Sequence, residues 1–227
     1  MVSFLTIISG LAWTIVYLDS IRIGFRDKTY AMPIAALALN VAWESTYAVH
    51  DLITSLSIQA FVNVAWALAD VAIVFTYFKF GRMELPRFVT RAMFAAWCLL
   101  ILGTCYAAQW LFLARFGAHD ASRYSAFLQN ALMSGLFIQM VIARRGLRGQ
   151  TLTIAIAKWL GTLAPTFLFG VIEGSPFILG LGIICCVFDL IYIGLVLCFQ
   201  SRQGGFSASG TEQRRSNTNL QEYLRQS

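Results

Sequence analysis

Three carboxylic acids lie deep inside long apolar stretches of this 227-residue chain: Glu44, Asp70 and Asp189. An ionisable side chain within an apolar helix costs free energy, and it usually faces a bundle interior or a cavity. A buried carboxyl group without a cationic partner stays protonated at neutral pH, and a neutral carboxylic acid can donate a proton. The sequence therefore offers three candidate proton donors in surroundings that hold little water.

Each acid has polar and aromatic companions at helical spacing, so each set forms a stripe on one helix face. The companions are Asn40, Trp43 and Tyr47 around Glu44, Asn63 and Trp66 before Asp70, and Phe188 and Tyr192 around Asp189. Aromatic faces stabilise cations through their quadrupole, and an apolar cavity protects a cation from water. The three stripes predict a pocket suited to proton-initiated carbocation chemistry, such as the cyclisation of a polyene.

Several of these side chains also have a purely structural interpretation. Intramembrane Asn and Ser often only join helices by hydrogen bonds, which is the favoured role of Asn130 in a fourth stripe with Ser134. Tryptophan at helical spacing is commonly a packing residue. Lys158 either extends to the membrane interface or pairs with Asp70 or Asp189.

Metal and cofactor chemistry is not indicated. The chain lacks a DDxxD-type cluster that would hold Mg²⁺ and a diphosphate, and it lacks a DxDD acid motif. Its five cysteines show no CxxC pair, and its two histidines, His50 and His119, fall in separate predicted loops. We expect no metal, no cofactor and no disulfide framework.

The elements that must position these groups are transmembrane helices. The chain is 58% hydrophobic and 12% charged, against about 25% charged in soluble domains, and its mean hydropathy is +0.68. A crossing uses about 20 residues, so the length allows seven helices and no separate soluble catalytic domain. Apolar runs predict an all-α bundle of seven transmembrane helices at about 3–21, 33–50, 58–80, 91–114, 124–142, 152–172 and 177–199. The N-terminal run is expected to be a retained helix, and the polar segment 200–227 a disordered tail.

Basic residues are distributed unequally between the two ends of these helices. Fourteen of the 17 lysine and arginine residues fall in the loops at about 22–28, 79–91 and 144–148 and in the tail, whereas the opposite side holds only Arg115 and Arg123. Because positive residues stay on the cytoplasmic side, we expect a luminal or external N-terminus and a cytoplasmic C-terminus. Topology and attraction to membrane lipid headgroups account for the net charge of +6 without nucleic acid.

The motifs, taken in order, resemble those of a known family. They are N-x-x-W-E-x-x-Y at 40–47, W-x-x-x-D at 66–70 followed by F-G-R at 80–82, Q-N-x-x-M-S-x-L-F-I at 129–138, R-G-Q-T at 148–151, K-W-L-G-T at 158–162 and F-D-x-x-Y at 188–192. This set is similar to the small integral-membrane terpene cyclases. These are noncanonical seven-helix enzymes of fungal meroterpenoid and indole-diterpene pathways, with relatives in bacterial indole-terpenoid pathways. The resemblance covers the second to seventh predicted helices and little of the first helix or the tail.

The resemblance implies a prenylated aromatic or heteroaromatic substrate that cyclises, without metal, after protonation of a terminal epoxide or, in some relatives, an alkene. It also implies that Glu44 and Asp189 are essential. We assign Glu44 as the general acid, whereas Asp189 would hydrogen-bond to Glu44 and reprotonate it or take part in the final deprotonation. The role of Asp70 stays open. The membrane would be an endoplasmic-reticulum-type endomembrane in a fungus or the cytoplasmic membrane in a bacterium, and the sequence does not specify the oligomeric state.

The competing class is a seven-helix small-molecule transporter or receptor. Sugar and amino-acid carriers with this topology have Pro-Gln motifs in two repeated halves, whereas none of the four prolines here is followed by glutamine. A retinal protein would need a Schiff-base lysine in the last helix, where this chain has Asp189. A purely structural membrane subunit is a third alternative.

Overall fold

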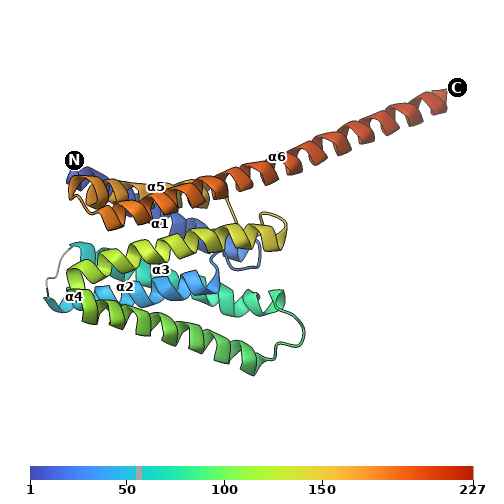
Figure 1. Cartoon of the computed structure of the whole chain (residues 1–227). Coiled ribbons are helices and arrows are strands. Elements are labelled where there is room, and N and C mark those ends of the chain that lie inside the picture. Colours follow the sequence, from blue (N-terminus) through green and yellow to red (C-terminus); the bar gives the residue numbers. More distant parts are fainter. Residues whose placement is uncertain (55–57, 227) are drawn as a thin grey trace.

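The computed structural model describes residues 1–54 and 58–226, and it describes side chains over 1–54 and 61–202. Within these residues the chain forms helices and no strands, which confirms the predicted all-α class (Figure 1). The α-helices are α1 (Val2–Arg26), α2 (Ile34–Thr54), α3 (Ile58–Phe80), α4 (Arg91–Arg144), α5 (Leu152–Pro165) and α6 (Pro176–Gln226). A 3₁₀ turn, η1 (Gly81–Glu84), follows α3, and a π-helical segment, η2 (Thr166–Ile172), continues α5.

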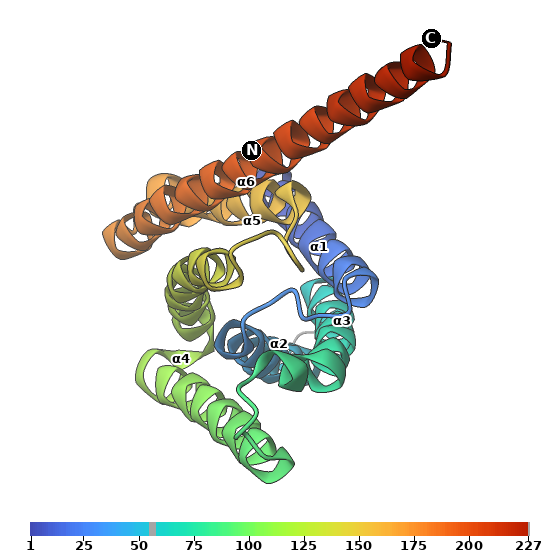
Figure 2. The ribbon, with the colours of Figure 1, turned by 90° about the vertical axis from the view of Figure 1, so that its right-hand side faces the viewer.

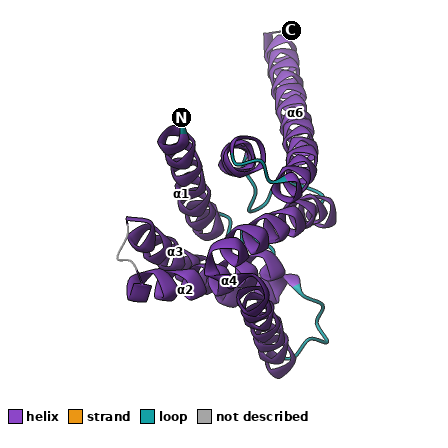
Figure 3. Ribbon diagram, turned by 60° about the vertical axis from the view of Figure 1, so that its left-hand side comes forward, coloured by secondary structure: helices purple, strands orange, loops and turns teal. Residues whose placement is uncertain are grey.

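The helix α4 consists of two limbs joined at Gly117. The backbone of Gly117 has φ 71° and ψ 164°, a conformation outside the helical region that glycine adopts without the penalty of a Cβ. The two limbs, 91–116 and 118–144, turn back on one another there (Figures 1 and 3). A straight helix of 54 residues would be about 80 Å long, far more than the roughly 30 Å hydrocarbon core of a bilayer.

The structure differs from the sequence prediction in two places. The predicted break over 115–123 is helical on both sides of Gly117, so the turn takes a single residue. The segment 200–226, predicted to be disordered, continues α6 as a helix that projects beyond the bundle (Figure 1). The Gln, Arg, Glu and Leu residues over 212–226 favour helix, whereas Gly204, Gly205 and Gly210 do not. The extension of an existing helix requires no new nucleation.

Five helical stretches within the described residues are long and apolar enough to cross a membrane. They are α1, α4 and the stretches Phe61–Glu84, Leu152–Ile172 and Pro176–Arg202. The helix α2 is not among them because its polar residues, including Asn40, Glu44 and Asp51, lower its hydropathy. These long apolar helices indicate a helical membrane protein.

The helices close into a ring, seen nearly end-on in Figure 2. Going round the ring, α1 packs against α3, α3 against α2, α2 against α4, α4 against α6, α6 against α5, and α5 against α1. The first limb of α4 lies on the outside of this ring, where Cys105 packs against Ala38 and Ala42 of α2. The main core includes Val16 and Ile73, which are fully buried.

The π-helical segment η2 follows from Pro165 at the end of α5. Proline has no N–H to donate to the preceding turn, so the regular hydrogen-bond pattern is interrupted there. Gly170 then lets η2 approach α6 closely, since a Cβ at this position would lie 3.0 Å from Leu179. Segments of π-helix occur frequently at functional sites, and this one forms part of the cavity described below.

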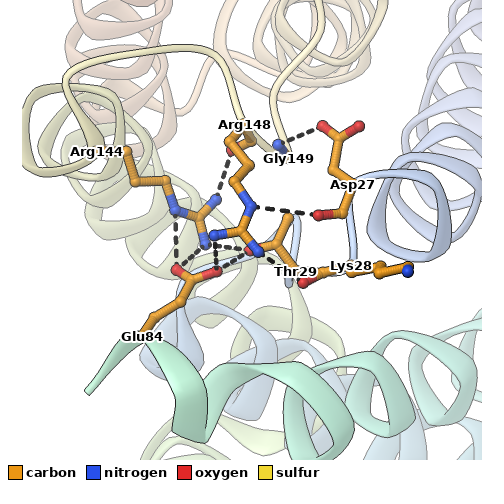
Figure 4. Close-up of polar contacts among 7 residues, drawn as sticks. All are labelled: Asp27, Lys28, Thr29, Glu84, Arg144, Arg148 and Gly149. Carbon is orange, nitrogen blue, oxygen red and sulfur yellow. Dashed lines mark hydrogen bonds and ion pairs between the residues drawn. The ribbon is translucent and has the colours of Figure 1, made fainter. Parts of the chain in front are cut away.

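A polar cluster connects the loops at the end of the bundle opposite the N-terminus (Figure 4). Arg144 Nη2 lies 2.8 Å from Glu84 Oε2 and 3.0 Å from Thr29 Oγ1, and Arg144 also lies over the ring of Tyr30. Arg148 Nη1 lies 3.6 Å from Glu84 Oε1. Glu84 of η1 is thus held by two arginines from the end of α4 and the loop after it.

The R-G-Q-T motif continues this cluster to the loop after α1. Arg148 donates to the backbone carbonyl oxygens of Asp27 and Lys28 at 3.2 and 2.8 Å, and the Gly149 N–H donates to the Asp27 carboxylate at 2.9 Å. Burial alone would raise the pKa of Asp27, but hydrogen bonds from Arg26 and Gly149 bring its pKa below the ordinary value. The motif therefore joins loops instead of lining a cavity.

Candidate active site

A cavity of about 830 Å³ opens at the end of the bundle where the N-terminus lies. Its walls come from 5–17 of α1, 40–54 of α2, 62–66 of α3, 118–130 of α4 and 165–169 around η2. The volume is within the range of about 300–1,000 Å³ typical of small-molecule sites. The first residues of α1 and the last residues of α2 lie at the mouth of the cavity. Tyr17, late in α1, and Asn40 and Glu44, early in α2, therefore lie at its inner end.

The structure brings most of the predicted site residues to this cavity. Those that line it are Asn40, Trp43, Glu44, Tyr47, Asn63, Trp66 and Asn130. The predicted residues outside its wall are Asp70, Phe188, Asp189 and Tyr192, as far as the described side chains go. The stripes on α2 and α3 therefore meet at one site, whereas the stripe on α6 does not join them.

Glu44 is 3% exposed and has its carboxyl group at the inner end of the cavity. The hydroxyl group of Tyr17, on α1, donates to Oε1 of Glu44. Asn40 Nδ2 donates to the Tyr17 hydroxyl oxygen at 3.1 Å, and Gln129 Nε2 donates to Asn40 Oδ1 at 3.3 Å. No described group donates to Oε2 of Glu44, and the Glu44 carboxyl group also interacts with the carboxyl group of Asp70.

Asp70 of α3 lies behind Glu44 and is fully buried. The two carboxyl groups are close enough to interact, and neither forms an ion pair with any cation in the described part of the chain. Neighbouring carboxyl groups without a cation are unfavourable when both are ionised, so such a pair can hold a proton between its members. This arrangement suits a site that stores and delivers one proton.

Aromatic rings surround the inner part of the cavity. Tyr17 stacks on Trp66 with ring centroids 6.0 Å apart, and Trp13 lies 6.5 Å from Tyr17. Trp43 packs against Tyr47 at 5.1 Å. Indole N–H groups fix two of these rings, since Trp66 donates to Thr14 Oγ1 at 3.1 Å and Trp43 to a backbone carbonyl oxygen of α4 at 2.9 Å. Rings held in this way present faces that can stabilise a cation.

Asp189 lies in a different environment. Its Oδ1 is 2.7 Å from Nζ of Lys158, which also donates to Ser134 Oγ at 2.6 Å, and all three residues are fully buried. This confirms the alternative in which Lys158 pairs with Asp189. A hydrogen bond between Asp189 and Glu44, one of the two alternatives for Asp189, is absent from the contacts of the described residues: Lys158 binds Oδ1 of Asp189, and Oδ2 has no partner among them.

The companions of Asp189 likewise lie away from the cavity. Phe188 is 40% exposed on the outer face of α6. Tyr192 is fully buried, donates its hydroxyl hydrogen to Gln150 Oε1 and packs against Phe137. Tyr192 thus connects α6 to α4 and to the loop before α5.

Sequence reasoning missed the contribution of α1. Trp13, Thr14 and Tyr17 lie on one face of this helix and line the cavity, as does Gln129 of α4. A pattern of buried acids does not identify them, because α1 has no acid at this depth. The spacing of Trp13 and Tyr17, one helical turn apart, was the signal available in the sequence.

The mouth of the cavity is polar. Arg123 Nη1 lies 2.5 Å from Glu173 Oε2, and the Arg123 guanidinium lies 4.2 Å from the ring centroid of Phe169. His50 Nδ1 lies 3.2 Å from Asp51 Oδ1. Over the described residues, His, Cys, Asp and Glu side chains form no group of three or more that could ligate a metal.

Comparisons with known proteins show the family that this chain resembles. A family model described as "Pyr4-like transmembrane terpene cyclases" matches residues 1–202, so the match includes α1. The chain is 30% identical over 168 residues to "Pyr4-family terpene cyclase mfmH" of Annulohypoxylon moriforme, which covers 73% of this chain and 68% of that protein. It is 28% identical over 200 residues to "Terpene cyclase pyr4" of Aspergillus fumigatus, with 81% and 80% covered. It is 29% identical over 170 residues to "Terpene cyclase ascF" of Acremonium egyptiacum, with 68% and 61% covered.

Proposed function

This chain belongs to the Pyr4-like transmembrane terpene cyclases, and on that basis we propose that it cyclises a prenylated aromatic or heteroaromatic substrate by proton-initiated, metal-independent chemistry. The family makes the protein an enzyme that cyclises terpenoids, as the motifs indicated, and decides against the transporter and receptor alternatives. Substrate class, initiating acid and independence from metal are the parts that we propose.

The observation that supports Glu44 as the initiating acid is its place at the inner end of the cavity, beside Asp70 and without a cation. Oε2, to which no described group donates, is the oxygen that would carry the proton. The aromatic rings around it exclude water and stabilise positive charge. No other acid of the described cavity wall is buried to this extent.

The reaction that follows is an isomerisation in which the proton is returned. Glu44 gives its proton to a terminal epoxide oxygen, the C–O bond breaks, and a carbocation forms beside a new hydroxyl group. For an alkene, the proton adds to carbon instead. Neighbouring double bonds then attack the cation in turn and form the rings. The final cation loses a proton, which restores Glu44 directly or through Asp70.

We propose that Asp189 acts by position and not as an acid. Its ion pair with Lys158 connects α6 to α5, and Ser134 joins the pair to α4. Ser134 also donates to the backbone carbonyl oxygen of Asn130, which lines the cavity. Loss of this pair would displace one wall of the cavity. The alternative, in which Asp189 takes part in the final deprotonation, requires it to leave Lys158.

We propose seven crossings, with the limbs of α4 counted separately. The N-terminus and the cavity mouth then face the lumen or exterior, and the basic loops face the cytoplasm together with the C-terminus. The membrane would be an endoplasmic-reticulum-type endomembrane in a fungal cell or the cytoplasmic membrane in a bacterial one. Substrate would enter from the lipid or from the luminal side.

The test is to incubate membranes that contain the protein with a panel of epoxidised and non-epoxidised prenyl-arenes in the presence of EDTA. We expect at least one substrate to give a cyclic product of identical mass, identified by NMR. Failure of the whole panel would contradict the proposed substrate class. Activity that EDTA abolishes and Mg²⁺ restores would contradict a proton donor as the initiator.

A further inference from the structure

We infer that Tyr17 is a positioning residue for the reaction: it fixes Oε2 of Glu44 as the oxygen that carries the transferred proton, and it stabilises the carboxylate left behind. This inference rests on the proposed function, in which Glu44 is the acid. It adds Tyr17 to Glu44 as a second residue that acts in the reaction. Tyr17 belongs to α1, the helix that contains none of the family motifs. The observations that support it are the order and direction of the hydrogen bonds at the inner end of the cavity.

The hydrogen-bond chain has a fixed direction. Gln129 Nε2 donates to Asn40 Oδ1, and Asn40 Nδ2 donates to the Tyr17 hydroxyl oxygen. A phenol has a single hydrogen to donate. Because the Tyr17 oxygen already accepts from Asn40, its hydrogen points to Oε1 of Glu44. Oε1 is therefore an acceptor, and the proton of a neutral Glu44 must be on Oε2.

The same bond favours transfer of the proton. When the Oε2–H bond breaks and the proton joins the substrate, Glu44 becomes a carboxylate in apolar surroundings. Hydrogen bonds to an ionised acceptor are stronger than those to a neutral one, so the bond from Tyr17 strengthens as the transition state is approached. An interaction that is stronger in the transition state than in the ground state raises kcat and leaves KM nearly unchanged.

Tyr17 is held for this role by its surroundings. It is 3% exposed and is stacked on Trp66, whose indole N–H is itself bound to Thr14 of α1. The hydroxyl group therefore has little freedom to leave Glu44. Removal of the hydroxyl keeps this packing intact, which makes Tyr17→Phe an informative change.

The experiment compares full-length wild type with Tyr17→Phe, using the prenylated arene or epoxide that the wild type converts. We expect kcat to fall by about ten- to a hundredfold, the effect of one hydrogen bond to a charged group, with KM within about twofold. Tyr106→Phe is the matched control. Tyr106 also shares a hydroxyl hydrogen bond, with Ser45 at 2.7 Å, but lies outside the cavity wall, so its kcat should stay at the wild-type value.

A second variant tests the chain itself. Asn40→Leu removes the donor that directs Tyr17, and it should lower kcat in the same manner. The double variant should be no slower than Tyr17→Phe alone within about twofold, because both changes act through one bond to Glu44. Melting temperatures in detergent show whether each variant is folded. If Tyr17→Phe is not folded, the kcat of Asn40→Leu tests the inference instead.

The outcomes separate the two proposals. A wild type that converts no member of the panel removes the proposed function and this inference together. An active wild type with unchanged kcat in Tyr17→Phe overturns the inference alone. A change confined to KM also overturns it, since Tyr17 would then be only a wall of the substrate site.

Discussion

Lys158 and Asp189 place opposite charges at fully buried positions, with Nζ and Oδ1 2.7 Å apart. Transfer of both charges out of water costs free energy, and the attraction between them offsets this cost only while both charges are present. Loss of one partner leaves an uncompensated charge, which costs about 3–5 kcal/mol. The pair is therefore expected to matter for folding whether or not Asp189 takes part in the reaction.

The two roles of Asp189 can be separated by replacing the pair as a unit. Asp189→Asn and Lys158→Met, made singly, should each lower the melting temperature and the turnover. Lys158→Met with Asp189→Leu should recover most of the stability, because apolar pairs of similar volume commonly replace buried ion pairs without loss. If Asp189 acts only by position, the double variant should also recover measurable turnover.

Lys28→Met, a change at an exposed lysine, is the control for loss of a positive charge. A double variant that is as stable as wild type and yet inactive would contradict a positioning role and assign Asp189 to proton transfer.

The sequence alone could not distinguish the three buried acids. Glu44, Asp70 and Asp189 all lie in apolar helices with aromatic residues one turn away. What differs is the partner from another helix: a lysine for Asp189, and a second carboxyl group for Glu44 and Asp70. Such pairings depend on how helices are arranged around the ring, which helical periodicity does not specify.

In α4 a single residue, Gly117, forms the turn between the two limbs of the helix. Gly117 has φ 71°, and a Cβ added there would meet no atom within 4 Å. Any effect of a substitution is therefore a backbone effect. The start of the second limb supplies cavity residues 118–130, so the geometry at Gly117 also places that wall.

Gly117→Ala should lower stability by about 1–3 kcal/mol, the expense of a non-glycine residue in this conformation. Gly103→Ala is the matched control in the same helix, because Gly103 also has open space for a Cβ but lies within the first limb. There alanine should be neutral or stabilising by up to about 1 kcal/mol. Thermal unfolding in detergent measures both, and effects of equal sign and size would contradict the turn at Gly117.

Charged residues between 115 and 123 were sufficient to predict a break in the chain here, but not its length. Charged residues predict a loop that is as long as the polar segment. In the structure a single glycine with positive φ reverses the chain, and the residues on both sides of it are helical. The same limitation applies to the tail, where a polar composition predicted disorder and the helix of α6 continues.

For the whole molecule, the distribution of charge and the position of the cavity lead to one orientation. The polar cluster of Glu84, Arg144 and Arg148 lies at the end opposite the N-terminus, and the cavity opens at the N-terminal end. Arginine-rich loops stay on the cytoplasmic side. The mouth should consequently face away from the cytoplasm.

Glycosylation tags at the two termini test this orientation in a eukaryotic host. We expect modification of an N-terminal tag and none of a C-terminal tag, because the seven proposed crossings place the termini on opposite sides. Modification of the C-terminal tag alone would show the opposite orientation. The same result at both termini would show that they lie on one side and that the number of crossings is even.

The all-helical class and the presence of several long apolar helices could be predicted because hydropathy acts on each segment separately, whereas seven crossings and their orientation stay predictions. The ring order, with α1 between α3 and α5, could not be predicted, because it depends on side-chain packing between segments far apart in the chain. The cavity follows from that order, since it needs α1, α2, α3 and α4 together.

The central claim is that Glu44 supplies the proton that starts cyclisation, and turnover by Glu44→Gln tests it most directly. Glutamine keeps the shape of the side chain and an oxygen to accept from Tyr17, but it has no transferable proton. The account predicts a melting temperature close to that of wild type and a loss of roughly 10²–10⁴-fold or more in turnover, as for removal of a positioned general acid. Near-normal turnover by the folded Glu44→Gln variant would contradict it.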